Sequence, residues 1–165
     1  IAASRNKTYQ VKQQLQGYKA DGVTEIAKED LLYTDADFLI PAALEGQITA
    51  DNADRVKAKY IVEGANGPTS YEADQILNAK GKIVVPDILA NAGGVIVSYF
   101  EWVQNLQSLS WSLEEVNNKL ADILLKAFDE VYGLTEERGY PMRTSAYIIA
   151  LRRLVKTKKI RGIFP

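Results

Sequence analysis

Residues 59–86 read KYIVEGANGPTSYEADQILNAKGKIVVP, and this stretch decides the fold class. The runs at its two ends, residues 59–63 and 82–86, are short and continuously apolar, which is typical of strands that are covered on both faces. The segment between them has the length and the start signal of a helix. A strand, a helix and a second strand of these lengths form a βαβ crossover, so we predict a parallel sheet.

The predicted crossover helix has recognisable signals at both ends. Thr69 and Glu72 have the spacing of a capping box, in which the Thr69 hydroxyl accepts from the amide of Glu72 and the Glu72 carboxylate reaches back. The helix should run to about Ala79, where Gly81 is well placed to end it.

The pattern continues on both sides of this crossover. Residues 37–41 form a third apolar run that is closed by a proline, and beyond residue 88 the pattern becomes helical, first over about 90–106. A second capping box at Ser112 opens a long helix that Gly139 ends, and a third helix is expected over about 143–156. The long helix has an apolar stripe that we expect to be core, made of Leu113, Val116, Leu120, Ile123, Ala127, Val131 and Leu134.

The chain is expected to form one domain in two parts. Residues 1–87 should be a partial dinucleotide-binding α/β unit, and residues 88–165 a C-terminal helical segment. Residues 1–3 are typical of the end of a buried strand and are followed by a short helix over about 8–18. Because the first residue is not Met and lies within this strand pattern, we expect the chain to be a piece of a longer protein.

Composition narrows the possible functions. Of the 165 residues, 20 are basic and 21 acidic, and the net charge of −1 lacks the positive field that non-specific nucleic-acid binding needs. The absence of Cys and His excludes disulfides, thiolate chemistry, imidazole bases and the usual zinc sites from this chain. No apolar run approaches the roughly 18 residues of a membrane span, and no leader is recognisable. We therefore expect no nucleic-acid or membrane partner, no metal, and a cytoplasmic location.

Small residues and amides follow each of the three predicted strands, at residues 41–43, 64–66 and 87–91. In an open α/β sheet the ligand lies beyond the carboxyl ends of the strands, so these segments should line one crevice. Gly and Ala allow close approach to the backbone, while an Asn amide offers both a donor and an acceptor. For any one segment, tight turn packing is the competing interpretation.

Two adjacent glycines, Gly93 and Gly94, open the helix that follows the third strand. Each costs roughly 1 kcal/mol of helix propensity against Ala, so close approach by a ligand is one use for them and a helix-packing notch is the other. Val95 and Ser98, three residues apart, lie on the same face of this helix.

Three motifs together resemble the glutamate dehydrogenase family, which includes the leucine, phenylalanine and valine dehydrogenases. They are DFLIPAALE at residues 37–45, EGANGPT at 63–69 and PDILANAGGV at 86–95. The resemblance covers nearly the whole chain. It implies an α/β fold with a partial Rossmann-like parallel sheet and C-terminal helices. The first strand and glycine-rich turn of the nucleotide-binding domain are absent here, and no GxGxxG occurs.

The resemblance also implies an activity, the reversible NAD(P)-dependent oxidative deamination of L-glutamate to 2-oxoglutarate and ammonia by the full-length protein. The family's catalytic Lys and Asp do not lie in this chain, so no catalytic residue is assigned, and the chain alone should be inactive. A homo-oligomer, the family's hexamer, is expected for the full-length protein. The implied cofactor contacts are Ala42, Ala43, Ala65, Asn66 and Asn91. The Ser matching Ser98 contacts the substrate side-chain carboxylate in the family, and Val95 borders the substrate.

The choice between NAD and NADP depends on residues 3–7. An acid in this region would repel a 2′-phosphate, and the resemblance places Ala3 where the family often has one. Ser4 and Arg5, with Lys7 nearby, therefore favour NADP, although an ordinary solvated loop explains them equally well.

Several alternatives stay open on the sequence. A leucine, valine or phenylalanine dehydrogenase is a rival enzyme, and a non-catalytic nucleotide-binding module or a purely helical interaction domain is a rival of another class. The basic segment 143–165 is interpreted as a docked amphipathic helix with a solvated basic face. Its apolar face consists of Tyr147, Ile148, Leu151, Leu154 and Val155.

Overall fold

The computed structural model describes residues 18–162, which belong to two compact units, residues 1–32 and 33–165. The predicted strand end at residues 1–3 and nearly all of the predicted helix at 8–18 lie outside the described residues. In the first unit the described chain is irregular up to the start of the 3₁₀ helix η1 (Lys28–Tyr33). All other elements belong to the second unit. The boundary between the two units lies at residue 32 and does not test the predicted division of the chain at residue 87.

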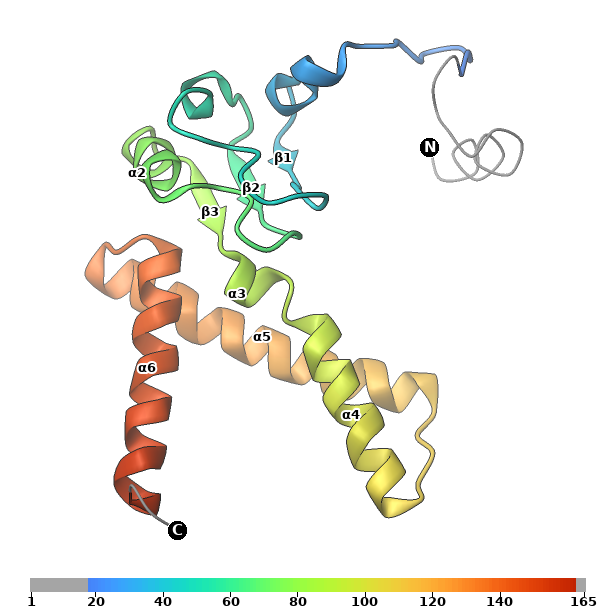
Figure 1. Ribbon diagram of the computed structural model, residues 1–165, viewed down its shortest axis with the longest axis vertical. Helices are drawn as coiled ribbons and strands as arrows, with labels where there is room; N and C mark the ends of the chain where they lie inside the picture. The colour runs from blue at the N-terminus through green and yellow to red at the C-terminus, as the bar shows by residue number, and fades with distance from the viewer. Residues whose placement is uncertain (1–17, 163–165) are drawn as a thin grey trace. The chain divides into compact units, whose positions relative to one another are not determined.

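The second unit contains the predicted parallel sheet (Figure 1). Its strands are β1 (Phe38–Leu39), β2 (Tyr60–Val62) and β3 (Ile83–Val85), in the spatial order β1-β2-β3. Tyr60 pairs with Phe38 on one side and with Ile83 on the other. The three apolar runs therefore form the expected strands, and the α/β prediction is confirmed.

A hydrophobic core packs against this sheet beneath the short 3₁₀ helix η2 (Ala53–Arg55) and the crossover helix α2 (Tyr71–Ala79). Its central side chains, Ile61 and Leu77, are fully buried. The cluster consists of Ala, Val, Ile and Leu side chains from the strands, the loops, η2 and α2. Its members are Ile48, Ala53, Val56, Ala58, Ile61, Ala73, Leu77 and Val84.

Helix α2 starts one residue later than predicted. Ser70, not Thr69, is the N-cap, and its hydroxyl oxygen accepts from the amide of Ala73 at 3.2 Å. Thr69 is instead held in extended backbone by a parallel bridge to Ile48, which leaves Ser70 as the first residue free to cap the helix. At the other end Gly81 has a φ of +70° and the predicted terminating role is confirmed.

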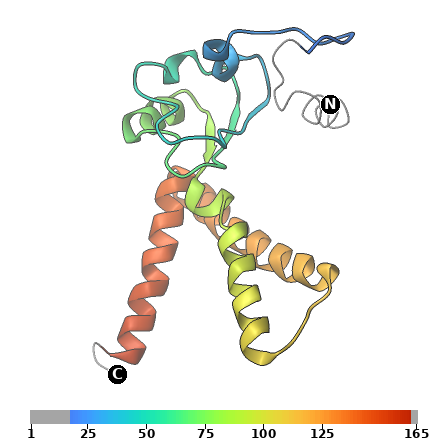
Figure 2. The same cartoon turned by 45° about the vertical axis from the view of Figure 1, so that its right-hand side comes forward.

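Four helices follow β3 (Figure 2). A single helix over 90–106 was expected, but the chain forms a short α3 (Asp87–Ala90) and then α4 (Gly93–Gln107). Asn91, with φ −101° and ψ 6°, and Ala92 form a turn between the two helices, and both glycines lie in the first turn of α4. The long helix α5 (Leu113–Arg138) begins with the predicted capping box at Ser112, and α6 (Met142–Arg161) extends five residues beyond its expected end.

The helices bury less apolar surface than their patterns predict. Where α5 and α6 meet α3 and the sheet, Leu89, Val131, Met142 and Ala146 form a second buried cluster. Of the stripe predicted to be core on α5, only Val131 is buried, and Leu113 is 77% exposed. Helix α6 packs through its first two turns, whereas its predicted apolar face is exposed from Leu151 onward. Val116, Leu120, Ala127 and Leu134 are half-buried, so the stripe is partly packed within residues 18–162. The docking of α6 beyond its first two turns stays a prediction.

Candidate functional site

Backbone hydrogen bonds join the segments that directly follow β1 and β2. The carbonyl of Pro41 accepts from the amide of Gly64 at 3.0 Å and from the amide of Ala65 at 2.9 Å. A Cβ on Gly64 would lie 2.9 Å from the Cβ of Ala42, a distance that side-chain carbons do not tolerate. The glycine is therefore required by the close approach of the two strand ends.

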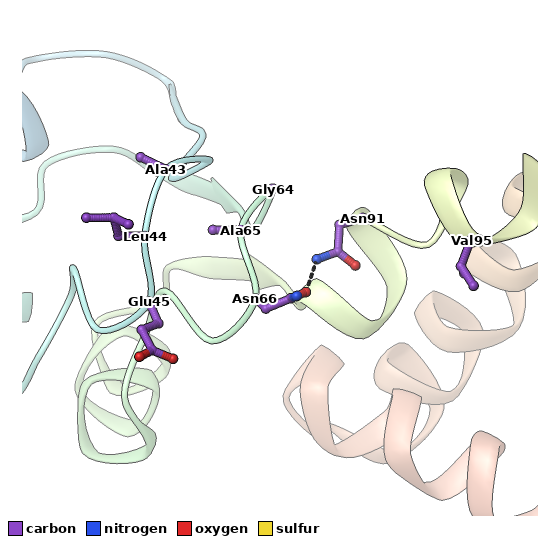
Figure 3. Close-up of a pocket in the computed structure, with 8 residues that line it drawn as sticks. All are labelled: Ala43, Leu44, Glu45, Gly64, Ala65, Asn66, Asn91 and Val95. Atoms are coloured by element: carbon purple, nitrogen blue, oxygen red, sulfur yellow. Dashed lines mark hydrogen bonds between the residues drawn. The ribbon is translucent and has the colours of Figure 1, made fainter. Parts of the chain in front are cut away.

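An open cavity of about 730 Å³ lies beyond these strand ends, within the range of small-molecule and cofactor sites (Figure 3). Its walls come from the loops after β1 and β2, from the end of α3 and from the first turn of α4. The lining residues are Ala43, Leu44, Glu45, Gly64, Ala65, Asn66, Asn91 and Val95. Five of the residues predicted for a ligand site thus line one pocket, although they come from four separate segments of the chain.

Two amides face one another in this pocket. The Nδ2 of Asn91 donates to the Oδ1 of Asn66 at 2.7 Å, and Figure 3 shows the two side chains meeting between the loop after β2 and the end of α3. Among the described residues the Nδ2 of Asn66 and the Oδ1 of Asn91 have no hydrogen-bond partner. The pair therefore presents one donor and one acceptor toward a ligand, beside walls of small side chains that expose backbone.

The remaining predicted site residues do not line this cavity. Ala42 packs beneath Gly64. Ser98 lies on an exposed part of α4, one turn after Val95. Ser4 and Arg5 fall outside the described residues, so the predicted preference for NADP has no structural counterpart here.

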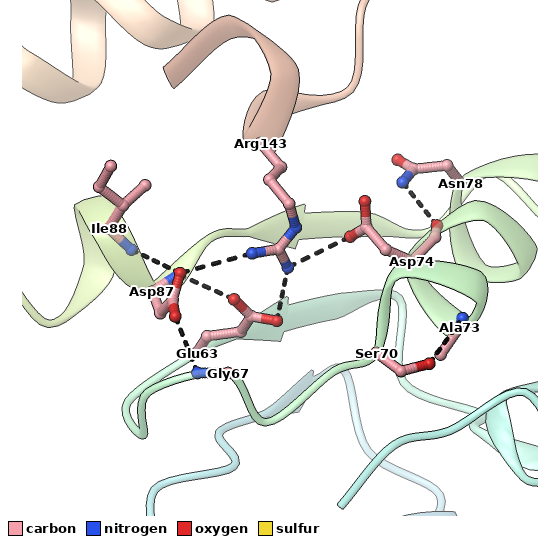
Figure 4. A network of polar contacts seen from close by, with 9 residues as sticks. All are labelled: Glu63, Gly67, Ser70, Ala73, Asp74, Asn78, Asp87, Ile88 and Arg143. Atoms are coloured by element: carbon pink, nitrogen blue, oxygen red, sulfur yellow. Dashed lines mark hydrogen bonds and ion pairs between the residues drawn. The ribbon is translucent and has the colours of Figure 1, made fainter. Parts of the chain in front are cut away.

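A largely buried ionic network joins the residue that directly follows β2 to helices α2, α3 and α6 (Figure 4). Arg143, from the first turn of α6, places its Nη2 2.6 Å from the Oε1 of Glu63 and 3.3 Å from the Oδ1 of Asp74, and its Nη1 3.4 Å from the Oδ1 of Asp87. The side chain of Glu63 is fully buried, and that of Arg143 is 17% exposed. A single guanidinium therefore contacts three carboxylates, one from the residue that follows β2, one from α2 and one from α3.

The protonation of Arg143 is secured by these partners. Burial alone would lower the pKa of the guanidinium, but the hydrogen bond to Glu63 and the charges of Asp74 and Glu63 outweigh burial and raise this pKa well above its usual range. The carboxylates thus surround a permanent organic cation, and no group of acidic side chains in residues 18–162 has an arrangement suited to a metal ion.

Sequence analysis missed this network. Glu63 lies 80 residues from Arg143, and no local pattern connects them. The usable signal was the position of Glu63, an acid that directly follows a buried strand and therefore requires a partner.

Comparison with known proteins identifies the family of this chain. The sequence model of the glutamate/leucine/phenylalanine/valine dehydrogenases matches residues 2–162. The glutamate dehydrogenase of Thermotoga maritima is 57% identical over 140 residues, which are 85% of this chain and 34% of that protein. An NADP-specific glutamate dehydrogenase of Synechocystis is 54% identical over 84% of this chain and 32% of its own length. An NAD-specific one of Staphylococcus aureus is 52% identical over 83% and 33%.

Solved structures agree with the sequence relatives. A hetero-hexameric glutamate dehydrogenase of Thermus thermophilus in a leucine-bound form superposes with a TM-score of 0.86 at 35% identity, over 99% of this chain and 38% of that one. The chain thus spans about a third of the length of the curated relatives named above. By sequence and by fold, the chain belongs to the glutamate/leucine/phenylalanine/valine dehydrogenase family.

Proposed function

We propose that this chain is the cofactor-binding part of a glutamate dehydrogenase, which oxidatively deaminates L-glutamate to 2-oxoglutarate and ammonia in the reversible, NAD(P)-dependent reaction. The observation that supports this most is the pocket beyond the three strand ends, where Asn66 and Asn91 meet among small residues. This is where an open parallel sheet binds its nucleotide.

The residues of this pocket suit a dinucleotide. Ala43 and Ala65 leave room for a flat ring or a sugar against the backbone, and the free amide groups of Asn66 and Asn91 can bond a ribose hydroxyl or a carboxamide. Ala42 supports the loop from below. A bound nicotinamide dinucleotide supplies hydride transfer, and the role of these residues is to bind and orient it. No general acid or base is proposed within this chain.

For the substrate we propose glutamate. Val95 borders the pocket, and Ser98, one turn further along α4, is proposed to donate to the side-chain carboxylate of the substrate when the rest of the protein completes the site. The relatives named above are all called glutamate dehydrogenases, which favours glutamate over leucine, valine or phenylalanine.

For the cofactor we propose a nicotinamide dinucleotide, without a choice between NAD and NADP. Relatives of nearly equal identity are named NADP-specific and NAD-specific, so similarity does not favour either. For the assembly we propose a homo-hexamer; the hexameric structural relative is itself a hetero-hexamer. The described helices do not include one long and apolar enough to cross a membrane.

The experiment that tests this function replaces Asn91 by Ala in the full-length protein that contains this chain. Loss of the amide leaves a buried polar group of the cofactor unpaired, which costs roughly 1 to 3 kcal/mol and should raise the cofactor KM about fivefold to a hundredfold. Asn117→Ala, on the exposed surface of α5, is the matched control and should leave this KM unchanged.

The same assay with glutamate, leucine, valine and phenylalanine decides the substrate. Glutamate should have the highest kcat/KM with the unmodified protein, and a preference for an apolar amino acid would contradict the glutamate assignment. An unchanged cofactor KM in Asn91→Ala would remove Asn91 from the site.

A further inference from the structure

We infer that Glu63, Asp87 and Arg143 are positioning residues that hold Asn66 against Asn91, and that Arg143 thereby connects the C-terminal helix α6 to the ligand pocket. The inference rests on the proposed function, because it concerns the same pocket. It adds three residues that do not line the cavity and that no local sequence pattern connects.

The loops after β2 and β3 exchange a reciprocal pair of hydrogen bonds. The backbone amide of Asp87 donates to the Oε2 of Glu63 at 2.8 Å, and the backbone amide of Gly67 donates to the Oδ2 of Asp87, also at 2.8 Å. Each carboxylate thus binds the backbone of the other loop. The relative position of the two loops is therefore set by two side chains rather than by strand pairing alone.

The two pocket amides lie directly on these locked segments. Asn66 directly precedes Gly67, whose backbone amide donates to the carboxylate of Asp87. Asn91 lies one helical turn after Asp87, and the backbone amide of Asn91 donates to the carbonyl of Asp87 at 3.1 Å. A shift of Asp87 would therefore move both partners of the 2.7 Å bond between Asn66 and Asn91. Side chains whose geometry must be held within a fraction of an ångström need such support.

Arg143 fixes the two carboxylates in turn. Its Nη2 binds the Oε1 of Glu63, which leaves Oε2 to accept from the amide of Asp87. Its Nη1 lies near the Oδ1 of Asp87, which leaves Oδ2 to accept from the amide of Gly67. The planar fork can therefore orient both carboxyl groups at once, whereas a lysine ammonium is a point charge that lacks this fixed geometry. Figure 4 shows the guanidinium reaching from the start of α6 between these side chains.

Asp74 provides an internal comparison. Its Oδ1 lies 3.3 Å from Arg143, nearly the same distance as that of Asp87, but Asp74 belongs to α2 and its side chain forms no hydrogen bond with the described residues of either pocket loop. If the network only stabilised the fold, loss of either carboxylate would have similar consequences. If it positions the pocket, only loss of Asp87 should affect cofactor binding.

The test compares Asp87→Asn with Asp74→Asn in the full-length protein. Both variants should lower the melting temperature. Asp87→Asn should also raise the cofactor KM about tenfold with kcat changed less than about twofold, because misplaced binding groups weaken an interaction made in the ground state as well as the transition state. Asp74→Asn should leave that KM within about twofold of the unmodified value.

Arg143→Lys is a second variant, in case Asp87→Asn does not fold. It keeps the positive charge beside Glu63 and loses the fork, so it should raise the cofactor KM as Asp87→Asn does. Arg153→Ala, on the same helix, removes an exposed pair with Glu130 and should leave the KM unchanged.

The outcomes separate this inference from the proposed function. Equal changes of the cofactor KM in Asp87→Asn and Asp74→Asn would overturn the positioning role. So would an unchanged cofactor KM in both Asp87→Asn and Arg143→Lys. In either case the proposed function would still stand if Asn91→Ala raised the cofactor KM. If Asn91→Ala had no effect on the KM either, Asn91 would not contact the cofactor, and the proposed cofactor site at this pocket would fail together with the positioning role.

Discussion

The α/β part of the second unit, residues 37–91, and its helices α4–α6 differ in how completely they bury their apolar side chains. Ile61 and Leu77 are fully buried between the sheet and its crossover helix, whereas Leu154 on α6 is 66% exposed. Both parts have well-formed apolar patterns in the sequence. The difference shows that a periodic pattern identifies which face of an element is apolar but does not identify what covers that face.

The largest expected effect separates the two parts directly. Leu77→Ala should destabilise the chain by about 2 to 5 kcal/mol, because it leaves a cavity in the packed core. Leu154→Ala makes the same chemical change on the exposed face of α6 and should cost less than about 0.5 kcal/mol. Urea unfolding of the two variants measures the difference. Equal losses would show that the apolar face of α6 is covered in solution.

Two glycines sharpen the same comparison with effects of opposite sign. Gly64→Ala should destabilise the chain by about 1 to 3 kcal/mol, because the new Cβ would lie 2.9 Å from the Cβ of Ala42. Within residues 18–162, no atom outside the backbone of α4 itself lies within 4 Å of a Cβ added at Gly94, in the first turn of α4, so Gly94→Ala should stabilise the helix by up to about 1 kcal/mol. Thermal unfolding distinguishes them, and destabilisation by Gly94→Ala would indicate a neighbour close to α4.

The α/β part was largely predictable because its signals are local. Strands buried on both faces appear as continuous apolar runs, and a parallel sheet brings their carboxyl ends together, which is why Asn66 and Asn91 could both be assigned to one pocket before their contact was known. The capping residue of α2 was misplaced by one position. The position of the cap depends on the bridge between Ile48 and Thr69. That bridge joins residues 21 positions apart, so no local pattern predicts it.

What sequence reasoning missed depends on distant residues. Arg143 was grouped with the basic segment 143–165, which was interpreted as a helix with a solvated basic face, yet it turns inward to Glu63, Asp74 and Asp87. No helical or strand periodicity encodes a pairing across 80 residues. The core stripe expected on α5 is only partly buried within residues 18–162 for a related reason, since spacing alone cannot supply the surface that would bury Leu113.

The smallest expected effect concerns the start of α5, which relies on local bonds rather than on a core. The Glu115 carboxylate accepts from the amide of Ser112 at 2.8 Å, while the Ser112 hydroxyl accepts from the amide of Glu115 at 3.2 Å. The backbone amide and then the hydroxyl of Ser112 lower the pKa of Glu115 below its ordinary value of 4.5.

Because the pKa of Glu115 is lower in the folded chain than in the unfolded one, its contribution is fully present above about pH 4.5 and is lost as the pH falls through the folded value. Glu115→Gln keeps an acceptor for the capping box but cannot titrate. The loss of melting temperature on acidification below pH 4.5 should therefore be slightly smaller in this variant than in the unmodified chain. The effect should be small because Glu115 is fully exposed to solvent. Identical acid profiles would mean that the bond to the Ser112 amide forms equally in the unfolded chain, and the start of α5 would then owe its stability to packing, as the α/β part does.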